Sequence, residues 1–281
     1  MKYKFFRFLA LLIMMVMATS YNKPLFFSMS AKSIQHNLAR VNDTLFVNKY
    51  ETSNQEYITF LQSLKERGSE LYTSAMIDST GWSTLVSYSS PMATYYHHHT
   101  AYSNYPVVNI SQQGAIAYCN WLTEQYLADS KRKFNKVQFF LPSAELWINV
   151  AGNGDKNRMY PWSNYYLRDK NGVFLCNFRS LGDQSISYDE ETKSYKIMPS
   201  FTKQGLNDRA LYTSPVNSFS PGPFGIFNFS GNVAEMVAEN GIAKGGSFHS
   251  TGYDVRIQSN INYTISSPEV GFRVFMRVIE P

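Results

Sequence analysis

Residues 155–240 show little sustained hydrophobic periodicity of either the helical or the strand kind, and this stretch constrains the fold most strongly. It is dense in Gly, Pro, Asn, Ser and aromatic residues, which favour turns and loops. Long structureless segments are uncommon in compact domains unless they carry function or are held by bound ions. We therefore expect a loop-rich domain whose irregular part carries function or binds ions.

Helical periodicity is confined to three segments. A capping box of Ser53 and Glu56 predicts the start of the first helix, and Ser111 can cap the second. The third is the shorter segment "PSAELWINVAGNG", which Gly152 or Gly154 can end. The apolar stripes are Tyr57, Phe60, Leu61 and Leu64 on the first helix, and Ala115, Tyr118, Cys119, Leu122 and Tyr126 on the second. Short strands are predicted at 45–47 and in "GFRVFMRV" near the end of the chain.

The composition is that of one folded domain. A chain of 281 residues with 44% hydrophobic content and a mean hydropathy of −0.29 is neither disordered nor collagen-like. From Asn42 to Pro281 there is no linker, fixed-period repeat or low-complexity tract. We therefore interpret this part as a single domain.

The first residues have the pattern of a secretory signal. Lys2, Lys4 and Arg7 precede an apolar run from Phe8 to Ala18, which is shorter than a membrane-spanning helix needs. We predict a signal peptide at 1–20, a lead-in at 21–43 and the domain at 44–281, with a retained membrane anchor as the alternative. The expected location is the periplasm or the outer membrane, with membrane contact only through partners or an uncleaved signal.

The charge and the cysteines carry less information. Removal of the three N-terminal cations lowers the formal net charge from +5 to +2, so we expect no nucleic-acid partner. Cys119 and Cys176 could form one disulfide in an oxidising compartment, and the sequence does not decide whether they do.

Seven segments occur in an order that resembles the formylglycine-generating enzyme (sulfatase-modifying factor) family. They are "YETSNQEYITFL", "YPVVNISQQGAIAYCNWL", "FFLPSAELWINVAGNG", "YPWS", "SPVNSFSPGPFGIFNFSGNVAEM", "KGGSF" and "GFRV". The resemblance covers roughly residues 44–279. It implies an irregular α+β fold related to C-type lectins, poor in regular secondary structure and often calcium-bound.

Three segments resemble a narrower branch of that family. "YYHHHTAYSNYPVV", "NGVFLCNF" and "GNVAEM" are similar to gliding-motility and type IX secretion lipoproteins of Bacteroidetes. This resemblance implies envelope or secretion-apparatus proteins as partners, although no Cys lies near the cleavage point to carry a lipid.

The resemblance also implies two structural calcium sites built from hard oxygen ligands. The first matches Asn228, Gly231, Val233 and Glu235, with the Gly and Val contributing carbonyl oxygens. The second matches Asn177, Phe178, Asp208 and Ala210, again with carbonyls from the apolar residues.

The copper-binding thiols of the family's oxidases have no counterpart. In "GGSFHSTGYDV" the two corresponding positions hold Ser250 and Val255, and neither can supply the soft thiolate that copper(I) prefers. Cys119 belongs to a helix stripe, and Cys176 lies near the second calcium match and not near the catalytic motif. We therefore expect no copper-dependent formylglycine formation.

The sequence also contains residues typical of a histidine metal site, a hydrolytic triad and an aromatic interface. His97, His98 and His99 are consecutive, so they cannot easily converge on one ion, and a solvated loop accounts for them. Ser247, Ser250, His249 and Asp254 have the residue types of a hydrolytic triad but lack a G-x-S-x-G motif. Five tyrosines crowd one turn-rich segment, either as an interface or as cover for an irregular core; they are Tyr88, Tyr95, Tyr96, Tyr102 and Tyr105.

Three functions follow, of which the first is preferred. The chain is interpreted as an exported, non-catalytic domain that serves as a binding or structural component of the bacterial cell envelope. The first alternative is a metal-dependent oxidoreductase with an altered centre around Ser247, His249 and Arg273. The second is a lectin-like module that binds a glycan or a peptide.

Overall fold

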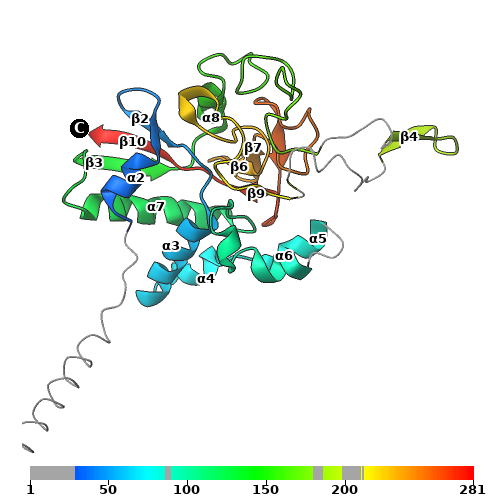
Figure 1. The fold of residues 1–281 in the computed structure, drawn as a ribbon. Helices are drawn as coiled ribbons and strands as arrows, with labels where there is room; N and C mark the ends of the chain where they lie inside the picture. Colours follow the sequence, from blue (N-terminus) through cyan, green and yellow to red (C-terminus); the bar gives the residue numbers. More distant parts are fainter. Residues whose placement is uncertain (1–28, 86–89, 180–185, 198–209, 211) are drawn as a thin grey trace, which may run out of the picture.

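The computed structural model describes residues 29–281 except 86–89, 180–185, 198–209 and 211. Its elements are short and joined by long loops, as the lack of periodicity predicts (Figure 1). The α-helices are α2 (Ala31–His36), α3 (Asn54–Glu66), α4 (Leu71–Ala75), α5 (Trp82–Leu85), α6 (Ser90–Tyr95), α7 (Gln112–Ala128) and α8 (Ala144–Ala151). The strands are β1 (Leu38–Arg40), β2 (Leu45–Asn48), β3 (Lys136–Phe140), β4 (Ile186–Asp189), β5 (Ser194–Ile197), β6 (Ala234–Met236), β7 (Ile242–Lys244), β8 (Asn260–Asn262), β9 (Val270–Gly271) and β10 (Phe275–Glu280). Short 3₁₀ turns occupy Ser79–Gly81, Thr100–Tyr102 and Pro223–Gly225.

The largest sheet joins distant parts of the chain. Its strand order is β1-β2-β10-β3, and all neighbours are antiparallel. Phe275 of the C-terminal strand β10 faces Val47 on one side and Phe140 on the other. Because β10 lies between β2 and β3, the C-terminal strand joins the two N-terminal strands to β3 in one sheet.

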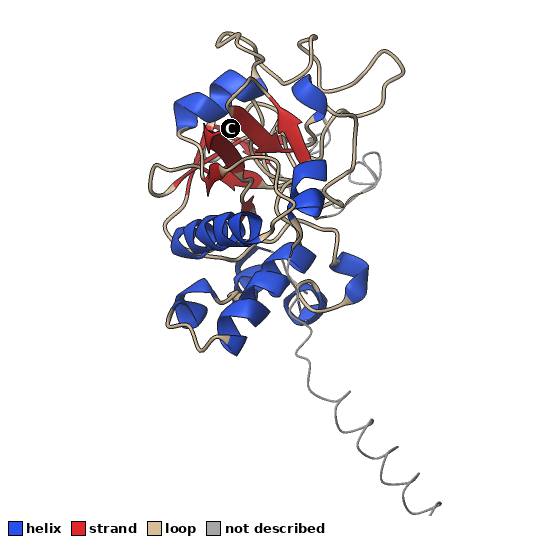
Figure 2. Cartoon of the chain, turned by 90° about the vertical axis from the view of Figure 1, so that its left-hand side faces the viewer, coloured by secondary structure: helices blue, strands red, loops and turns tan. Residues whose placement is uncertain are grey.

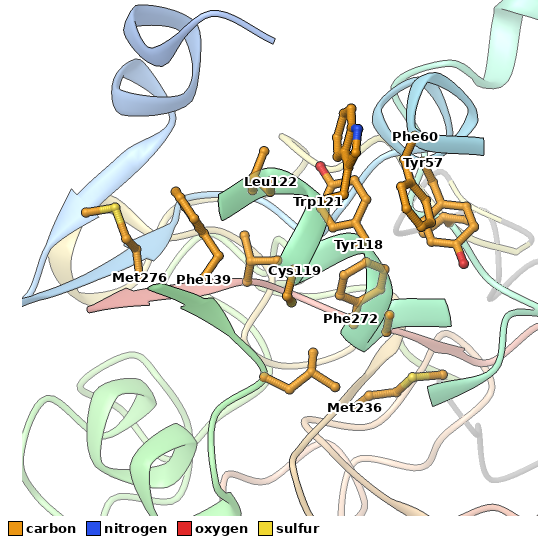
Figure 3. Packing of buried hydrophobic residues seen from close by; sticks show 14 of the residues in the cluster. Tyr57, Phe60, Tyr118, Cys119, Trp121, Leu122, Phe139, Met236, Phe272 and Met276 are labelled. Atoms are coloured by element: carbon orange, nitrogen blue, oxygen red, sulfur yellow. The ribbon is translucent and has the colours of Figure 1, made fainter. Parts of the chain in front are cut away.

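Helix α7 packs against this sheet and forms the main core with α3 (Figure 3). The Ser111 hydroxyl caps α7 by accepting from the Gly114 N–H at 3.0 Å, and every residue of the predicted stripe is buried. The rings of Tyr57 and Tyr118 are stacked with centroids 5.9 Å apart, and Phe272 meets both edge-on. Aromatic packing of this kind secures the helices to the sheet. Figure 2 shows α3, α4 and α7 gathered on one side of the strands.

Helix α3 begins as its capping box predicts. The Ser53 hydroxyl and the Glu56 backbone N–H are in contact, and the Glu56 carboxylate accepts from the Ser53 N–H at 2.8 Å. Helix α8 begins after Ser143 and ends at Gly152. All three predicted helices are therefore confirmed.

A second sheet carries the segments that the family resemblance singles out. Its order is β8-β7-β6-β9, and β6 pairs with β9 in parallel. The loop before β6 holds the "NFSGNV" segment, and the Gly-Gly-Ser motif follows β7 directly. This sheet therefore brings the two motifs together. A separate two-stranded hairpin is formed by β4 and β5.

The described fold begins before residue 44. Helix α2 and strand β1 lie in the segment expected to be a lead-in, and Ile34 is buried in the main core. The Ala31 N–H also donates to the Asp129 carboxylate at 2.8 Å. The predicted signal at 1–20 lies outside the described residues. Within the part that is described, no helix is both long and apolar enough to cross a membrane.

Candidate functional site

A fully buried carboxylate lies at the centre of the irregular part. Glu51 follows β2, and its oxygens accept hydrogen bonds from the side-chain amides of Asn228 at 2.9 Å and Asn232 at 3.0 Å. Asn232 in turn accepts from the Ser214 N–H at 2.7 Å, and the Asn177 amide lies 3.3 Å from the Asn232 side-chain oxygen. These five residues are defined here as the buried polar cluster. They tie four loop segments together without regular secondary structure.

The backbone of residues 228–232 is shaped to deliver these amides. Asn228, Gly231 and Asn232 have positive φ angles of 55°, 75° and 64°. A Cβ atom on Gly231 would lie 2.1 Å from the Asn177 carbonyl oxygen, so only glycine fits. The close approach of Gly231 to residue 177 is stabilised by the Asn232 N–H, which donates to the Asn177 carbonyl at 2.8 Å.

A buried ion pair adjoins this cluster. The Arg273 guanidinium contacts Glu235 through Nε at 2.9 Å and Nη2 at 2.6 Å, and both side chains are almost wholly buried. The remaining donors of Arg273 reach the carbonyls of Asn48 at 3.0 Å and Phe227 at 2.6 Å. The Trp147 indole N–H donates to the second Glu235 oxygen at 2.7 Å. The charges are therefore paired and their hydrogen-bonding groups are satisfied, which buried ions require.

The first predicted calcium set lies along the segment 228–235, whose last residue, Glu235, belongs to this ion pair. Among the described residues, no N–H donates to the carbonyl oxygens of Gly231 or Val233, so both oxygens suit a hard cation. The Glu235 carboxylate is engaged by Arg273, and the Asn228 amide by Glu51. A cation at this position would therefore share Glu235 with a guanidinium.

The second predicted calcium set is described only in part. Asn177 is buried and donates to the Tyr212 carbonyl at 2.7 Å, and Phe178 packs in a neighbouring apolar cluster. Ala210 is half-buried, and Asp208 lies outside the described residues.

At the two positions that hold thiols in the family's oxidases, the side chains present here are engaged in local packing and hydrogen bonding. The Ser250 hydroxyl accepts from the Ser247 N–H at 2.9 Å, within a tight turn. Val255 is fully buried. A Cβ on Gly246, whose φ is 69°, would meet both the Asp254 carbonyl oxygen and Val255 Cγ1 at 2.9 Å. The side chains present at these positions therefore do not fit copper(I).

Cys119 and Cys176 do not form a second pair of thiols that could bind copper in place of the missing ones. No disulfide joins Cys119 and Cys176, and both are buried. Burial raises the pKa of the Cys119 thiol, which disfavours the thiolate. Cys176 shares an apolar cluster with Val255. The expectation that Cys176 lies away from the catalytic motif is therefore wrong, because folding brings residue 176 back to residue 255.

A polar cluster forms beside the Gly-Gly-Ser motif. The Ser247 hydroxyl donates to one Glu269 oxygen at 2.6 Å, and His249 Nδ1 lies 3.5 Å from the other. The second ring nitrogen of His249 faces Arg179 Nη1 at 3.4 Å. Burial would raise the pKa of Glu269, but the hydrogen bonds of His249 and Ser247 and the charges of His249 and Arg179 hold it below its ordinary value.

This arrangement differs from both enzymatic alternatives. Ser247 and His249 share Glu269, whereas Arg273 pairs with the buried Glu235. The three residues of the altered-centre hypothesis therefore bind two different carboxylates. Asp254 accepts from the Thr251 hydroxyl at 2.7 Å, and the Ser247 hydroxyl accepts from the backbone N–H of His249 at 3.1 Å. A serine–histidine–aspartate relay is thus not assembled.

A cleft of about 930 Å³ opens next to this polar cluster. One wall is the loop 164–174, and the other consists of Phe178, Arg179, Thr251 and Gly252. The loop and the motif pack tightly, since a Cβ on Gly252 would lie 2.6 Å from Leu167 Cδ1. Pockets of this size accommodate small-molecule ligands.

The histidine and tyrosine segment is more buried than a solvated loop. His97 is buried and contacts the Asn54 side-chain oxygen at 3.0 Å, so the solvated-loop expectation is wrong for His97, although His98 and His99 are exposed. The described chain holds no group of three or more His, Cys, Asp or Glu side chains placed to share a metal.

Tyrosines of this segment divide between core and surface. Tyr96 is fully buried and donates to the Pro106 carbonyl at 2.7 Å, whereas Tyr95 is 54% exposed. Tyr102 and Tyr105 pack partly buried against the same cluster, and Tyr88 lies outside the described residues. Tyr96 is thus part of the core and cannot anchor a partner.

Sequence reasoning missed Glu51, Asn232, Arg179 and Glu269. Each stands in a short irregular segment, and each acquires its partners only through long-range contacts. For Glu51, the signal was a lone carboxylate directly after an apolar strand. No pattern pointed to the loop 164–174 as a cleft wall.

Glu51 gives the first prediction. Burial raises its pKa from 4.5 to about 8, against the lowering effects of the Arg273 charge and of the Asn228 and Asn232 hydrogen bonds. Between these values the unfolded chain binds fewer protons than the native one, so the free energy of unfolding falls as pH rises. We expect a fall of about 1 kcal/mol per pH unit between pH 6.5 and 8, measured by urea unfolding.

In most of that pH window, two other groups that would make the free energy of unfolding rise with pH contribute little. Burial lowers the pKa of His97 to about 3, which affects stability only below its unfolded value of 6.5. Burial lowers the pKa of Lys244 to about 8, so its opposing effect is small near pH 7 and grows as the pH approaches 8. Glu51→Gln should flatten the profile, and the exposed Glu66→Gln should leave it unchanged. Parallel profiles for wild type and Glu51→Gln would refute the assignment.

Known proteins resemble this chain in both sequence and fold. The model of the sulfatase-modifying factor enzyme 1-like domain (FGE-sulfatase) matches residues 26–278. A formylglycine-generating enzyme of Mus musculus is 28% identical over 137 residues, which are 49% of this chain and 28% of that protein. The inactive C-alpha-formylglycine-generating enzyme 2 of Bos taurus is 27% identical over 135 residues, 48% of this chain and 33% of that protein. The chain thus spans a third or less of these relatives.

Structural similarity agrees with the family match. The structure of PvdO from Pseudomonas aeruginosa matches with a TM-score of 0.52 and 17% sequence identity, over 83% of this chain and 80% of that one. Relatives include both active and inactive formylglycine-generating enzymes. The chain therefore belongs to the FGE-sulfatase family, and it has the mixed α+β, loop-rich fold of that family.

Proposed function

We propose that this domain is a non-oxidising member of its family that acts as an exported binding or structural component of the bacterial cell envelope. The observation that carries the proposal is the pair Ser250 and Val255, which hold a hydrogen-bonded hydroxyl and a buried aliphatic side chain where the oxidases hold thiols. The retained scaffold around them supports a binding role. The resemblance to gliding-motility and type IX secretion lipoproteins favours that apparatus as the partner.

A second candidate function is favoured by the cleft. Its 930 Å³ lie beside the Gly-Gly-Ser motif, and its walls combine aromatic and charged side chains. A lectin-like module that binds a glycan or a peptide would use such a surface. The altered metal centre has no comparable support, because Arg273 is engaged by Glu235.

Oxidase activity tests the proposal directly. Wild-type protein should not convert a cysteine-containing peptide in the presence of copper, because no two thiolates converge. Replacement of Cys119 and Cys176 by Ser should leave partner recovery unchanged, apart from packing losses. Ser250→Cys/Val255→Cys provides the matched comparison, and we expect it to compete for copper(I) more strongly than wild type. Copper-dependent conversion by wild type that is lost in the double Ser variant would overturn the proposal.

Export is tested on protein from its native host. Cleavage after the small residues of the signal should give a mature chain that begins near Thr19 or Tyr21 and fractionates with the envelope. Intact-mass measurement after cell fractionation checks this. A soluble cytosolic species that retains Met1 would contradict export.

We also propose structural calcium at both predicted sets of ligands, and the first set gives the sharper test. Its support is that no N–H of the described chain donates to the carbonyls of Gly231 and Val233. Binding to the native state alone stabilises by RT ln(1 + [L]/Kd), about 2.7 kcal/mol at a hundredfold excess of ion over Kd. Chelation should therefore lower the melting temperature of fully calcium-loaded protein.

The variant must separate calcium loss from ion-pair loss. Glu235→Gln leaves Arg273 without its counter-ion, which costs about 3–5 kcal/mol whether calcium is bound or not. The readout is therefore the change in melting temperature on adding calcium to stripped protein. This change should shrink in Glu235→Gln and persist in the exposed Glu66→Gln. Identical melting of stripped wild type with and without calcium would end the proposal.

A further inference from the structure

Three cations line the cleft, and one of them, Arg179, also acts electrostatically on the nearby Glu269. Arg168, Lys170 and Arg179 line it, and within the described residues none of them lies within 4 Å of a carboxylate oxygen. Asp169, the acid in the same lining, accepts from the backbone N–H groups of Asn171 and Val173 at 2.9 Å each. The cleft therefore has an excess of positive charge available to a ligand.

The Arg168 side chain and the Arg179 backbone are held in place before any ligand arrives. The Arg168 guanidinium lies 4.0 Å from the centroid of the Phe174 ring, and a β-bridge joins the two residues. The Arg179 N–H donates to the Ser250 carbonyl at 2.9 Å, which anchors its backbone to the motif turn. Positioned guanidinium groups match carboxylate or sulfate oxygens in a bidentate manner. Little ordering remains to be done when an anion binds.

Aromatic rings accompany the cations. Tyr166, Phe174 and Phe178 line the cleft, and Tyr166 is 74% exposed, whereas Phe174 and Phe178 are buried and the Arg168 guanidinium lies over the Phe174 ring. The Trp162 indole N–H donates to the Tyr166 carbonyl at 2.8 Å and steadies that segment. Rings with an accessible face offer flat apolar surface to a ligand that also has polar groups.

The lining favours a saccharide over an extended peptide. Among the described residues, no strand other than an isolated bridge lines the cleft, so a peptide finds no free sheet edge to extend. Sugar rings have C–H faces that pack against aromatic rings. Acidic saccharides also carry carboxylate or sulfate groups that bind guanidinium ions. We propose that this cleft binds an acidic saccharide through Arg168, Lys170 and Arg179 beside the exposed ring of Tyr166, an inference that rests on the proposed binding role.

Titration calorimetry on the full chain tests the proposal with three tetrasaccharides. The probes are tetragalacturonate, a sulfated tetrasaccharide and neutral maltotetraose. At least one acidic probe should bind about tenfold more tightly than the neutral one at low salt, and added salt should weaken it. Arg168→Gln, Lys170→Gln and Arg179→Gln should each weaken the acidic probe by about three- to tenfold. Lys65→Gln, an exposed cation on α3, should leave the affinity unchanged.

Melting curves establish that each variant is folded. Equal affinity for acidic and neutral probes, no binding of any probe at millimolar concentration, or full affinity in the triple variant would overturn the proposal. Tighter binding of an acidic peptide of equal charge would assign the cleft to peptides and overturn it as well. These outcomes are independent of the cysteine-peptide assay, so the non-oxidising role can stand when the saccharide proposal fails.

Discussion

The Arg273–Glu235 ion pair is the interaction on which the irregular half of the molecule depends. Arg273 lies between β9 and β10, while Glu235 lies in β6 of the other sheet. The guanidinium also contacts the carbonyls of Asn48 and Phe227, so a single side chain connects both sheets and the loop before β6. An apolar pair of the same volume could fill this space, but it would leave two buried carbonyls and the Trp147 indole without partners. The polar pair thus gives the sheets a defined relative position, which hydrophobic burial does not specify by itself.

The buried polar cluster extends the same principle to the loops. Residues 213–233 bury few large apolar side chains, so side-chain amides take the place of a regular hydrogen-bond ladder. Asn232 is the clearest case, because its amide donates to Glu51 and to the Ser214 carbonyl while its oxygen accepts from Ser214 N–H. Every such bond joins segments far apart in the chain. A loop-rich fold of this type is therefore stabilised by specific polar contacts whose loss leaves buried groups unsatisfied.

The contrast between locally encoded helices and long-range polar contacts explains how much of the structure could be predicted. Ser53, Ser111 and the apolar stripes predicted the helices, because caps and 3.6-residue periodicity are local properties. Burial of His97 and Tyr96 could not be read from their neighbours, which are exposed. The candidate site was predicted as sets of residues matched to a family, and calcium binding by the first set stays a prediction. The partners of that set, Arg273 for Glu235 and Glu51 for Asn228, lie tens to hundreds of positions away and have no local signature.

The two positions that hold thiols in the family's oxidases, Ser250 and Val255, contribute here to a turn and to an apolar cluster. Val255 packs with Phe178 and Cys176, and the Ser250 turn keeps its hydrogen bond to Ser247, so both positions contribute to local packing. In the described part of the chain, neither the Arg273–Glu235 pair nor Glu51 forms a hydrogen bond with the side chain of Ser250 or Val255. Substitution at the two thiol positions therefore leaves the interactions that hold the sheets and loops together unaffected. The cleft beside them keeps walls fixed by Gly252 and Phe174, and its ligand preference can be set by exposed residues such as Arg168 and Lys170 without a change to the core.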